Sequence, residues 1–400
     1  MPVEIRPCGD EDELVRALRT VTAAFGEEPS DADVERAKTT MPVDRVLVAV
    51  EGGRFVGVAA AWPFSITLPG GELPCPGVTW VGVLPTHRRR GVATALMRAQ
   101  IDDFRERGEP LAALWASESL IYERFGYGLA APIYKLNATK ARFAFRDDPG
   151  RVGAVRMVTR EEASELFPPV YERVRARRAG MLSRSKVWWW ESRLYVGPGP
   201  TGSGPRFFVV YEREGRSEGY AIYRQRSKWE HEIPEGSVLA IEVIGETLTA
   251  TRELWRFLFE IDLTERVEAE MIDPAGGLFL AVADPRRLQL TLSDGLWLRL
   301  VDVGAALVAR SWAADDSVVL EVHDRFCPWN DGRYRTGEGR VDEEPDIVLS
   351  AADVAAAYLG GIDVHALAAA GRVGERSEGA GARAAALFRT PLPPFCPETF

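Results

Sequence analysis

Cysteine and histidine are scarce in this chain of 400 residues, which contains only four of each. The cysteines lie far apart in the sequence, at Cys8, Cys75, Cys327 and Cys396. The histidines are equally scattered, at His87, His231, His323 and His365. Neither set has CxxC or HxxxH spacing, so we expect no metal site and no disulfide framework.

Long apolar runs and an excess of basic residues are also missing. No apolar stretch approaches the roughly 18 residues of a membrane span, and the first 13 residues are acidic where a signal peptide needs basic and then apolar residues. We therefore expect a cytoplasmic protein with no membrane partner. Lys and Arg number 49 against 59 Asp and Glu, a formal charge of −10, which disfavours nucleic acid and favours cationic partners.

The length exceeds the ~100 to 200 residues of one domain, and 46% hydrophobic residues allow two or three separate cores. Periodicity predicts a mixed α/β (α+β) first domain at 1–150. Its expected elements are strands at 3–7, 45–50, 55–60, 77–84, 111–115 and 128–134, a helix after Asp10, a helix from Gly91, and a helical turn through Tyr122.

A weak internal repeat follows at 151–289, with the same order of strand, helix, two strands, strand and helix. The Arg-rich and Gly-containing loop of the first copy is missing from the second, so we expect a degenerate copy. Residues 175–194 are basic and tryptophan-rich. We interpret them as a scaffold or interface helix, with nucleic-acid stacking as the alternative.

A third domain is expected at 290–400. The sequence predicts a strand, a turn at 293–295, a second strand and a helix, then a strand and a tryptophan-bearing turn within 318–335. Alanine-rich helices are expected at 351–359 and 382–388, with a polar loop at 374–381. The final ten residues contain four prolines, which predicts an extended, stiff tail.

The sharpest local signal is the run VGVLPTHRRRGVATAL at 81–96. Arg88-x-x-Gly91-x-Ala93 separates a strand from a helix, where free N–H groups meet the positive end of the helix dipole. Gly91 lets the backbone approach a phosphate, and Gly82 fits a bulge that splays the strand from its neighbour. No Lys-Ser/Thr pair follows, which excludes a nucleoside-triphosphatase loop. The alternative is a basic helix cap on the surface.

This loop resembles the pyrophosphate loop of the GCN5-related N-acetyltransferase (GNAT) superfamily. Longer segments resemble the Eis (enhanced intracellular survival) family: THRRRG at 86–91, ASE at 116–118, IYERFGYG at 121–128, the GMLSRSKVWWW run, DRFCPWNDGRYR at 324–335 and the C-terminal Phe. The resemblance implies a catalytic GNAT domain at 1–150, a degenerate GNAT-like domain at 151–289 and a sterol-carrier-protein-like domain at 290–400. It also implies a homohexamer that acetylates aminoglycosides and, in some members, protein lysines.

The resemblance also assigns roles to residues. The acetyl-CoA contacts are Val81, Gly82, Val83, Arg89, Arg90, Gly91, Val92, Ala93, Thr94, Ser117 and Glu118. Tyr122 matches the general acid that protonates the departing thiolate, with packing as its alternative role, and Tyr127 is expected to be structural. The general base of the family is the C-terminal carboxylate, which corresponds to Phe400.

Acidic and aromatic residues are expected around the acceptor. Glu27 matches a substrate-pocket aspartate of the family, and Glu28 and Glu398 are candidates by proximity in sequence. Trp80 and Trp115 stand where relatives carry Phe and His. This departure predicts a narrower or flatter pocket, so the range of antibiotics that the enzyme acetylates does not follow from the resemblance.

The resulting prediction is an N-acetyltransferase that uses acetyl-CoA as co-substrate and no metal. It transfers the acetyl group directly, in a ternary complex, to primary amines of cationic acceptors, with aminoglycosides as the expected class. Polyamines or protein lysines are the enzymatic alternatives. Two further hypotheses are a lipid-binding or scaffold protein and an inactive coenzyme A sensor. No cysteine has the neighbours of an acyl carrier.

Overall fold

The computed structural model describes residues 3–197, 199 and 202–400. These form two compact units, the first made of residues 1–131 and 294–400 and the second of residues 132–293. The chain leaves the first unit within strand β8 (Gly128–Thr139) and re-enters it within strand β16 (Thr291–Leu300). Within these described ranges, no helix is long and apolar enough to cross a membrane.

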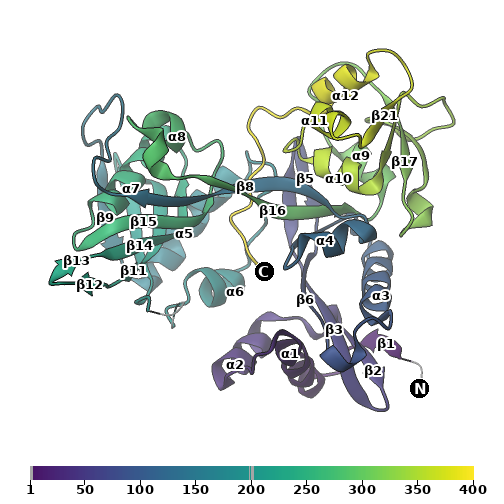
Figure 1. Cartoon of the computed structure of the whole chain (residues 1–400), viewed down its shortest axis with the longest axis horizontal. Coiled ribbons are helices and arrows are strands. Elements are labelled where there is room, and N and C mark those ends of the chain that lie inside the picture. The colour runs from purple at the N-terminus through teal and green to yellow at the C-terminus, as the bar shows by residue number, and fades with distance from the viewer. Residues whose placement is uncertain (1–2, 198, 200–201) are drawn as a thin grey trace. The chain divides into compact units, whose positions relative to one another are not determined.

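The N-terminal part of the first unit alternates strands and helices (Figure 1). Its main elements are β1 (Glu4–Pro7), α1 (Glu11–Phe25), α2 (Asp31–Thr40), β2 (Val46–Glu51), β3 (Arg54–Trp62), β4 (Ser65–Leu68), β5 (Gly71–Pro74), β6 (Gly77–Val83), α3 (Val92–Glu106), β7 (Leu111–Trp115) and α4 (Ser119–Tyr122). The sheet of this unit has the order β1-β2-β3-β6-β7-β16, in which only β6 and β7 pair in parallel.

Local sequence signals account for most of these elements. Asp10 caps α1, because its side chain accepts the N–H of Glu13. Gly52 and Gly53 both have positive φ, which gives the tight turn between β2 and β3 the twist that a hairpin needs. The strands and helices predicted over residues 1–134 are all present, with β8 extending five residues beyond the expected end.

Two elements of this part were not expected from the sequence. Helix α2 is weakly amphipathic and buries only Ala37, so its apolar periodicity is faint. Its signal was the capping box between Ser30 and Asp33. The hairpin of β4 and β5 consists of two strands of four residues each, which are too short for a clear alternation.

The C-terminal part of the first unit contains a five-stranded sheet in the order β19-β18-β17-β20-β21. Its elements are α9 (Val303–Ala309), β17 (Val319–His323), β18 (Gly332–Arg335), β19 (Gly339–Arg340), β20 (Ile347–Ser350), α10 (Ala351–Tyr358), α11 (Val364–Ala369), β21 (Val373–Glu375) and α12 (Ala380–Phe388). Helix α10 is buried over its whole length, which its alanines allow because small side chains pack closely.

The structure differs from the expectations for the C-terminal residues in three places. Residues 293–295 form no turn but lie inside the continuous strand β16, at the point where the chain passes between the units. The expected loop at 374–381 contains the end of edge strand β21 and the start of α12. Helix α11 was not predicted. The proline-rich tail has no regular element, as expected, but residues 394–398 are buried rather than exposed.

The second unit repeats the strand and helix order of the first. Its sheet runs β8-β15-β14-β11-β10-β9. Its main elements are β9 (Ala154–Val158), α5 (Arg160–Arg175), β10 (Phe207–Arg213), β11 (Arg216–Arg226), β14 (Gly236–Gly245), α7 (Leu248–Glu260) and β15 (Thr264–Ile272), with α8 (Leu278–Ala281) after them. Strands β14 and β15 are parallel, like β6 and β7.

The tryptophan-rich stretch at 175–194 is only partly helical, because regular helix is confined to α6 (Lys186–Trp188) and the following turn at Trp189–Arg193. Trp188 and Trp189 are buried inside the second unit, and Trp189 packs edge-on against Tyr171. These rings therefore fill a core, and the expected scaffold or interface helix is replaced by internal packing.

The second unit keeps the bulge of the first but not its helix start. Ile241 is the extra residue in the pairing of β14 with β11. The side chain of Thr247 accepts the N–H of Ala250 and thereby caps α7. The neighbouring Glu246 carboxylate is held by Arg173 and Arg216. Because the cap takes up one of the N–H groups at the helix start, fewer are left for a phosphate, which agrees with a degenerate copy.

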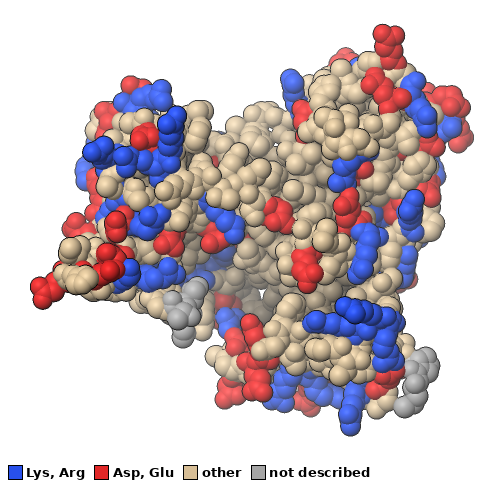
Figure 2. All heavy atoms as spheres, in the orientation of Figure 1, with Lys and Arg blue, Asp and Glu red and all other residues tan. Residues whose placement is uncertain are grey.

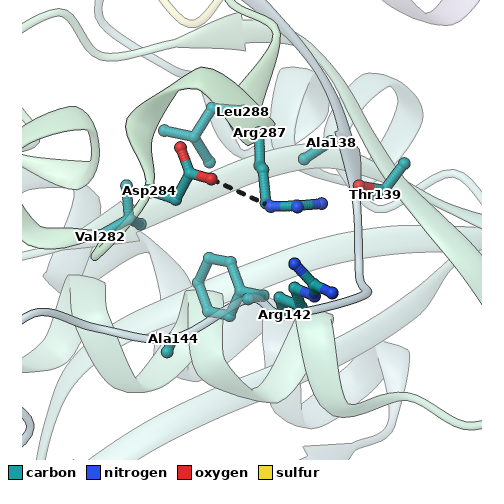
Figure 3. A pocket seen from close by; sticks show the side chains of 9 residues that line it. Ala138, Thr139, Arg142, Ala144, Val282, Asp284, Arg287 and Leu288 are labelled. Carbon is teal, nitrogen blue, oxygen red and sulfur yellow. Dashed lines mark hydrogen bonds and ion pairs between the residues drawn. The ribbon is translucent and has the colours of Figure 1, made fainter.

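A small pocket of this unit, between Thr139, Arg142 and the Asp284–Arg287 ion pair, has a volume of only about 10 Å³ (Figure 3). That is room for about one water molecule.

Acidic and basic side chains are interspersed over the face drawn in Figure 2, so the net charge is not concentrated in one patch there.

Candidate active site

Strand β6 is bulged and splayed at the centre of the first unit. Two of its residues, Trp80 and Val81, oppose the single residue Ala59 of β3, and Trp80 has a φ of 53°. The bulge therefore lies at Trp80 and Val81 and not at Gly82, where the sequence suggested it. Gly82 serves packing instead, since a Cβ at this position would lie 2.9 Å from the Val21 side chain.

The splay is visible in the pairing of β6 with β7. The two strands pair only at Gly77 with Ala113 and at Val78 with Leu114, after which they diverge. Beyond Val78, the β6 edge facing β7 carries backbone groups without a ladder partner among the described residues. An extended ligand with amide groups can pair with such an edge, because unpaired strand N–H and C=O groups favour hydrogen bonding.

The loop before α3 forms an open anion cradle. Gly91 precedes the helix with a φ of 81° and gives it no side-chain cap, so the first N–H groups of α3 have no partner within the helix. A Cβ built on Gly91 meets no described atom within 4 Å. Uncapped N–H groups and free space beside Gly91 thus occur together at this helix start, and the residues fit the diphosphate of a coenzyme A molecule.

The three arginines of this loop have different roles. Arg88 donates to the backbone oxygens of Ala24 and Val83, so it fastens α1 to the end of β6. Arg90 pairs with Glu51 at 2.6 Å, and this contact raises the pKa of Arg90 and lowers that of Glu51. Arg89 is exposed and has a positive φ, and its side chain makes no ion pair with the described residues. Arg89 is thus the guanidinium most available to a phosphate.

A cavity of about 250 Å³ opens beside the bulge. Its walls come from α1, β6, the end of β7, α4 and the last residue of the chain, and they are Leu18, Val21, Thr22, Phe25, Glu27, Val78, Thr79, Trp80, Val81, Trp115, Ser117, Tyr122 and Phe400. The cavity therefore joins residues that are more than 300 positions apart in the sequence.

Tyr122 lies on the floor of this cavity and is almost completely buried. Burial raises the pKa of its hydroxyl above 10, a hydrogen bond with Ser117 opposes that increase, and the charge of Glu118 adds to it. The hydroxyl therefore keeps its proton at neutral pH. Tyr127 packs edge-on against Tyr122 with ring centroids 6.1 Å apart. Its own hydroxyl is buried and has no hydrogen-bond partner among the described residues, as a packing residue would be.

The chain end is held in place by aromatic packing. The ring of Phe400 lies edge-on to Phe64, with centroids 5.4 Å apart. A Cβ added at Gly77 would lie 2.8 Å from the Phe400 ring, so the absence of a side chain at Gly77 makes room for the terminus. Residues 394–398 are buried and guide the tail to this position.

Most of the residues predicted for coenzyme A and acceptor are brought together here. Val81, Trp80, Trp115, Ser117, Tyr122, Glu27 and Phe400 share the cavity. Arg89, Arg90, Gly91, Ala93 and Thr94 surround the start of α3, whereas the Val92 side chain is buried in the core. Glu118 is exposed beside Ser117. Glu398 is completely buried and is not a wall of the cavity, and Glu28 is exposed outside it.

The sequence did not indicate the contribution of α1 to the cavity. Leu18, Val21, Thr22 and Phe25 form one wall. The available signal was the spacing of these residues by three or four positions, which is also that of an ordinary core-facing helix. Phe25 has this spacing but does not face the core, because more than half of its surface is exposed. This exposure is a property of the structure, so the sequence by itself did not mark Phe25 as a wall of the cavity.

Comparisons with known proteins agree with this geometry. Residues 4–130 and 180–300 match two family descriptions that both read acetyltransferase (GNAT) domain, and residues 303–397 match a sterol carrier protein domain. The predicted fold of tandem acetyltransferase-like domains and a sterol-carrier-protein-like domain is confirmed.

Whole-length relatives give the same result. An uncharacterized N-acetyltransferase of Streptomyces avermitilis is 39% identical over 97% of this chain and 96% of its own. The N-acetyltransferase Eis of Mycobacterium tuberculosis is 32% identical over 96% of both chains. The crystal structure of Eis1 from Mycobacterium abscessus covers 99% of this chain and 100% of its own, with a TM-score of 0.86 at 31% identity. The chain therefore belongs to the Eis family of GCN5-related N-acetyltransferases and is an acetyltransferase.

Proposed function

We propose that this enzyme transfers the acetyl group of acetyl-CoA directly to a primary amine of a cationic acceptor bound in the cavity at the bulge of β6. The observation that carries this proposal is that Tyr122 and Phe400 line one cavity together with Trp80 and Val81 of the splayed strand. Acid, base and thioester position are thus within one small space, as direct transfer in a ternary complex requires.

Acetyl-CoA supplies the activated acetyl group as a thioester. The N–H groups at the start of α3 and the guanidinium of Arg89 hold its diphosphate. Backbone N–H groups of residues 81–83 pair with the coenzyme and polarise the thioester carbonyl. The open Cβ direction at Gly91 and the divergence of β6 from β7 support this placement.

The proton steps fall to two residues. The carboxylate of Phe400 accepts a proton from the acceptor ammonium, directly or through water, and the free amine then attacks the carbonyl carbon. Tyr122 gives its proton to the thiolate as the carbon–sulfur bond breaks, and the second proton of the attacking nitrogen passes through water to the tyrosinate, which restores the acid as the amide forms. A buried hydroxyl with a pKa above 10 is protonated at neutral pH, so it is ready to act as an acid.

Aminoglycosides are the acceptor class that the resemblance implies, with polyamines and protein lysines as alternatives. We also propose that the enzyme works as a homohexamer. A thiol-release assay with acetyl-CoA and a panel of amines tests the reaction, and mass spectrometry counts the acetyl groups. Release of thiol only in the presence of amine supports the proposal. Tight acetyl-CoA binding without any amine-dependent release would instead indicate a coenzyme A sensor.

A further inference from the structure

Most residues that line the acceptor cavity have apolar side chains, and they alternate with polar groups. Apart from Tyr122, eight of its thirteen residues are aliphatic or aromatic, including Trp80 and Trp115 of the sheet and Phe25 of α1. The remaining walls offer four hydroxyl groups and one carboxylate side chain. Such a surface favours an acceptor that buries carbon, because contact between apolar surfaces is what stabilises binding there.

Negative charge at the walls is limited to two groups within the described part of the chain. Glu27 supplies the single acidic side chain among the described wall residues. The second group is the terminal carboxylate of the wall residue Phe400, to which the proposed mechanism gives the proton of the reacting amine. Glu398, the further expected acid, is fully buried and is not a wall of the cavity. Glu118 and Glu28 are exposed and lie outside the walls. The Phe400 carboxylate therefore balances the reacting ammonium group, and Glu27 is left as at most one acidic side chain for a further positive charge.

A polycation fits this cavity poorly. Additional ammonium groups would lie against the tryptophan and phenylalanine rings and lose their water without gaining a carboxylate. A single ammonium group is accommodated, since aromatic faces attract one cation. The volume of about 250 Å³ is just below the range of ~300–1,000 Å³ of pockets that bind drug-sized molecules, which also favours a small acceptor.

From the cavity we infer that the preferred acceptor is a small primary amine with one positive charge on an aromatic or aliphatic body, such as an arylalkylamine. This inference rests on the proposed acetyl transfer and departs from the aminoglycoside expectation. The indole rings of Trp80 and Trp115 hold the apolar body, and the amine points to the Phe400 carboxylate.

The test compares kcat/KM for 2-phenylethylamine, spermidine, kanamycin and a lysine peptide with the full-length enzyme and acetyl-CoA. We expect 2-phenylethylamine to exceed each of the others at least tenfold. A higher kcat/KM for spermidine, kanamycin or the peptide overturns the inferred acceptor class and leaves acetyl transfer intact. Turnover of none of the four amines, with acetyl-CoA bound, defeats the proposed function together with the inference.

Variants test the role of the walls. Trp80→Ala should lower kcat/KM for 2-phenylethylamine at least tenfold, mainly through KM, while the matched control Trp229→Ala, at an exposed tryptophan of the second unit, should change nothing. Phe25→Glu adds a second acidic wall at a half-exposed position, and thermal unfolding checks that the variant is folded. It should raise kcat/KM for spermidine several-fold and lower that for 2-phenylethylamine. Unchanged preference in both folded variants overturns the inference.

Discussion

Arg299 of β16 donates a hydrogen bond to Asp324 in the turn after β17, and both side chains are buried. The same carboxylate accepts the backbone N–H of Phe326 and Cys327 and the amide of Asn330. The ring of Phe326 then packs edge-on against Phe125, three residues after Tyr122, with centroids 5.0 Å apart. The ion pair thus holds the 324–330 turn of the C-terminal part against the helical turn that carries Tyr122.

Replacing Asp324 by Ala should destabilise the protein by about 3–5 kcal/mol, because a buried Arg299 is left without its partner. The measurement is the free energy of unfolding from urea denaturation. The matched control is Glu35→Ala, which removes an exposed ion pair with Lys38 and should cost no more than about 1 kcal/mol. Equal costs for the two variants would contradict the structural role of the buried pair.

Gly91→Asp should weaken acetyl-CoA binding at least tenfold, or more than ~1.4 kcal/mol, because a carboxylate then faces the diphosphate. Calorimetric titration with acetyl-CoA provides the measurement. Gly53→Asp is the control, since Gly53 also has a positive φ with free space around its Cβ position but lies in the turn between β2 and β3. Both variants should fold, and only the first should lose affinity.

Tyr122→Phe should lower kcat about a hundredfold with little change in acetyl-CoA affinity, because the hydroxyl acts only as charge develops on sulfur. Tyr127→Phe is the control. Its buried hydroxyl makes no hydrogen bond to the described residues, so its removal should leave the rate unchanged. A normal rate for the Tyr122 variant would assign that residue to packing alone.

The pH dependence gives a second test of Tyr122. Its pKa is raised above 10, so the protonated form that donates to the thiolate is present at all lower pH values and is lost as the pH rises through that pKa. Any alkaline decline of kcat due to Tyr122 should therefore lie at higher pH than the titration of an ordinary tyrosine. A decline centred near neutral pH that disappears in Tyr122→Phe would contradict the assignment.

Changes at the chain end should abolish activity while acetyl-CoA binding remains. Residues added after Phe400 move the carboxylate and fill the cavity, and deletion of Phe400 leaves a carboxylate about 3.5 Å short of its place. Phe400→Ala keeps the carboxylate and should retain partial activity. Gly77→Ala should lower kcat as well, because the new methyl group would displace the Phe400 ring.

The control for the chain end is the same protein with its tag at the N-terminus. Equal turnover by the N-terminally and C-terminally tagged enzymes on one acceptor would show that the terminal carboxylate is not the base. Glu27, the acidic side chain of the cavity, would then be the next candidate.

The expected homohexamer is tested by light scattering at micromolar concentration. A mass near the 44.2 kDa of one chain would contradict it. Trp188 and Trp189 do not support the assembly, because both are buried within the second unit, whereas Trp190, Trp312 and Trp329 are half-buried. The expectation therefore depends on the family alone.

Elements whose signals are short-range were predicted well from the sequence. The β2–β3 turn follows from two adjacent glycines, and the anion cradle from Gly91 between a strand and a helix. Helix α2 and β4 with β5 were missed because they bury little and have few residues in which a period can be recognised. The prediction of a turn at 293–295 was wrong for a different reason. These residues continue strand β16 within the sheet in spite of their turn-forming sequence.

Motifs of neighbouring residues were enough to identify the family, the phosphate-binding loop, and Tyr122 and Phe400 as candidates, because such motifs are written in consecutive positions of the chain. Long-range packing decides three further features. Arg88 holds α1 in place while Arg89 stays available to a ligand, and Glu398 is buried and is not a wall of the cavity. Helix α1 forms one wall of the cavity. These outcomes depend on which side chains pack against each other across long separations in the chain. Local sequence contains no record of that packing.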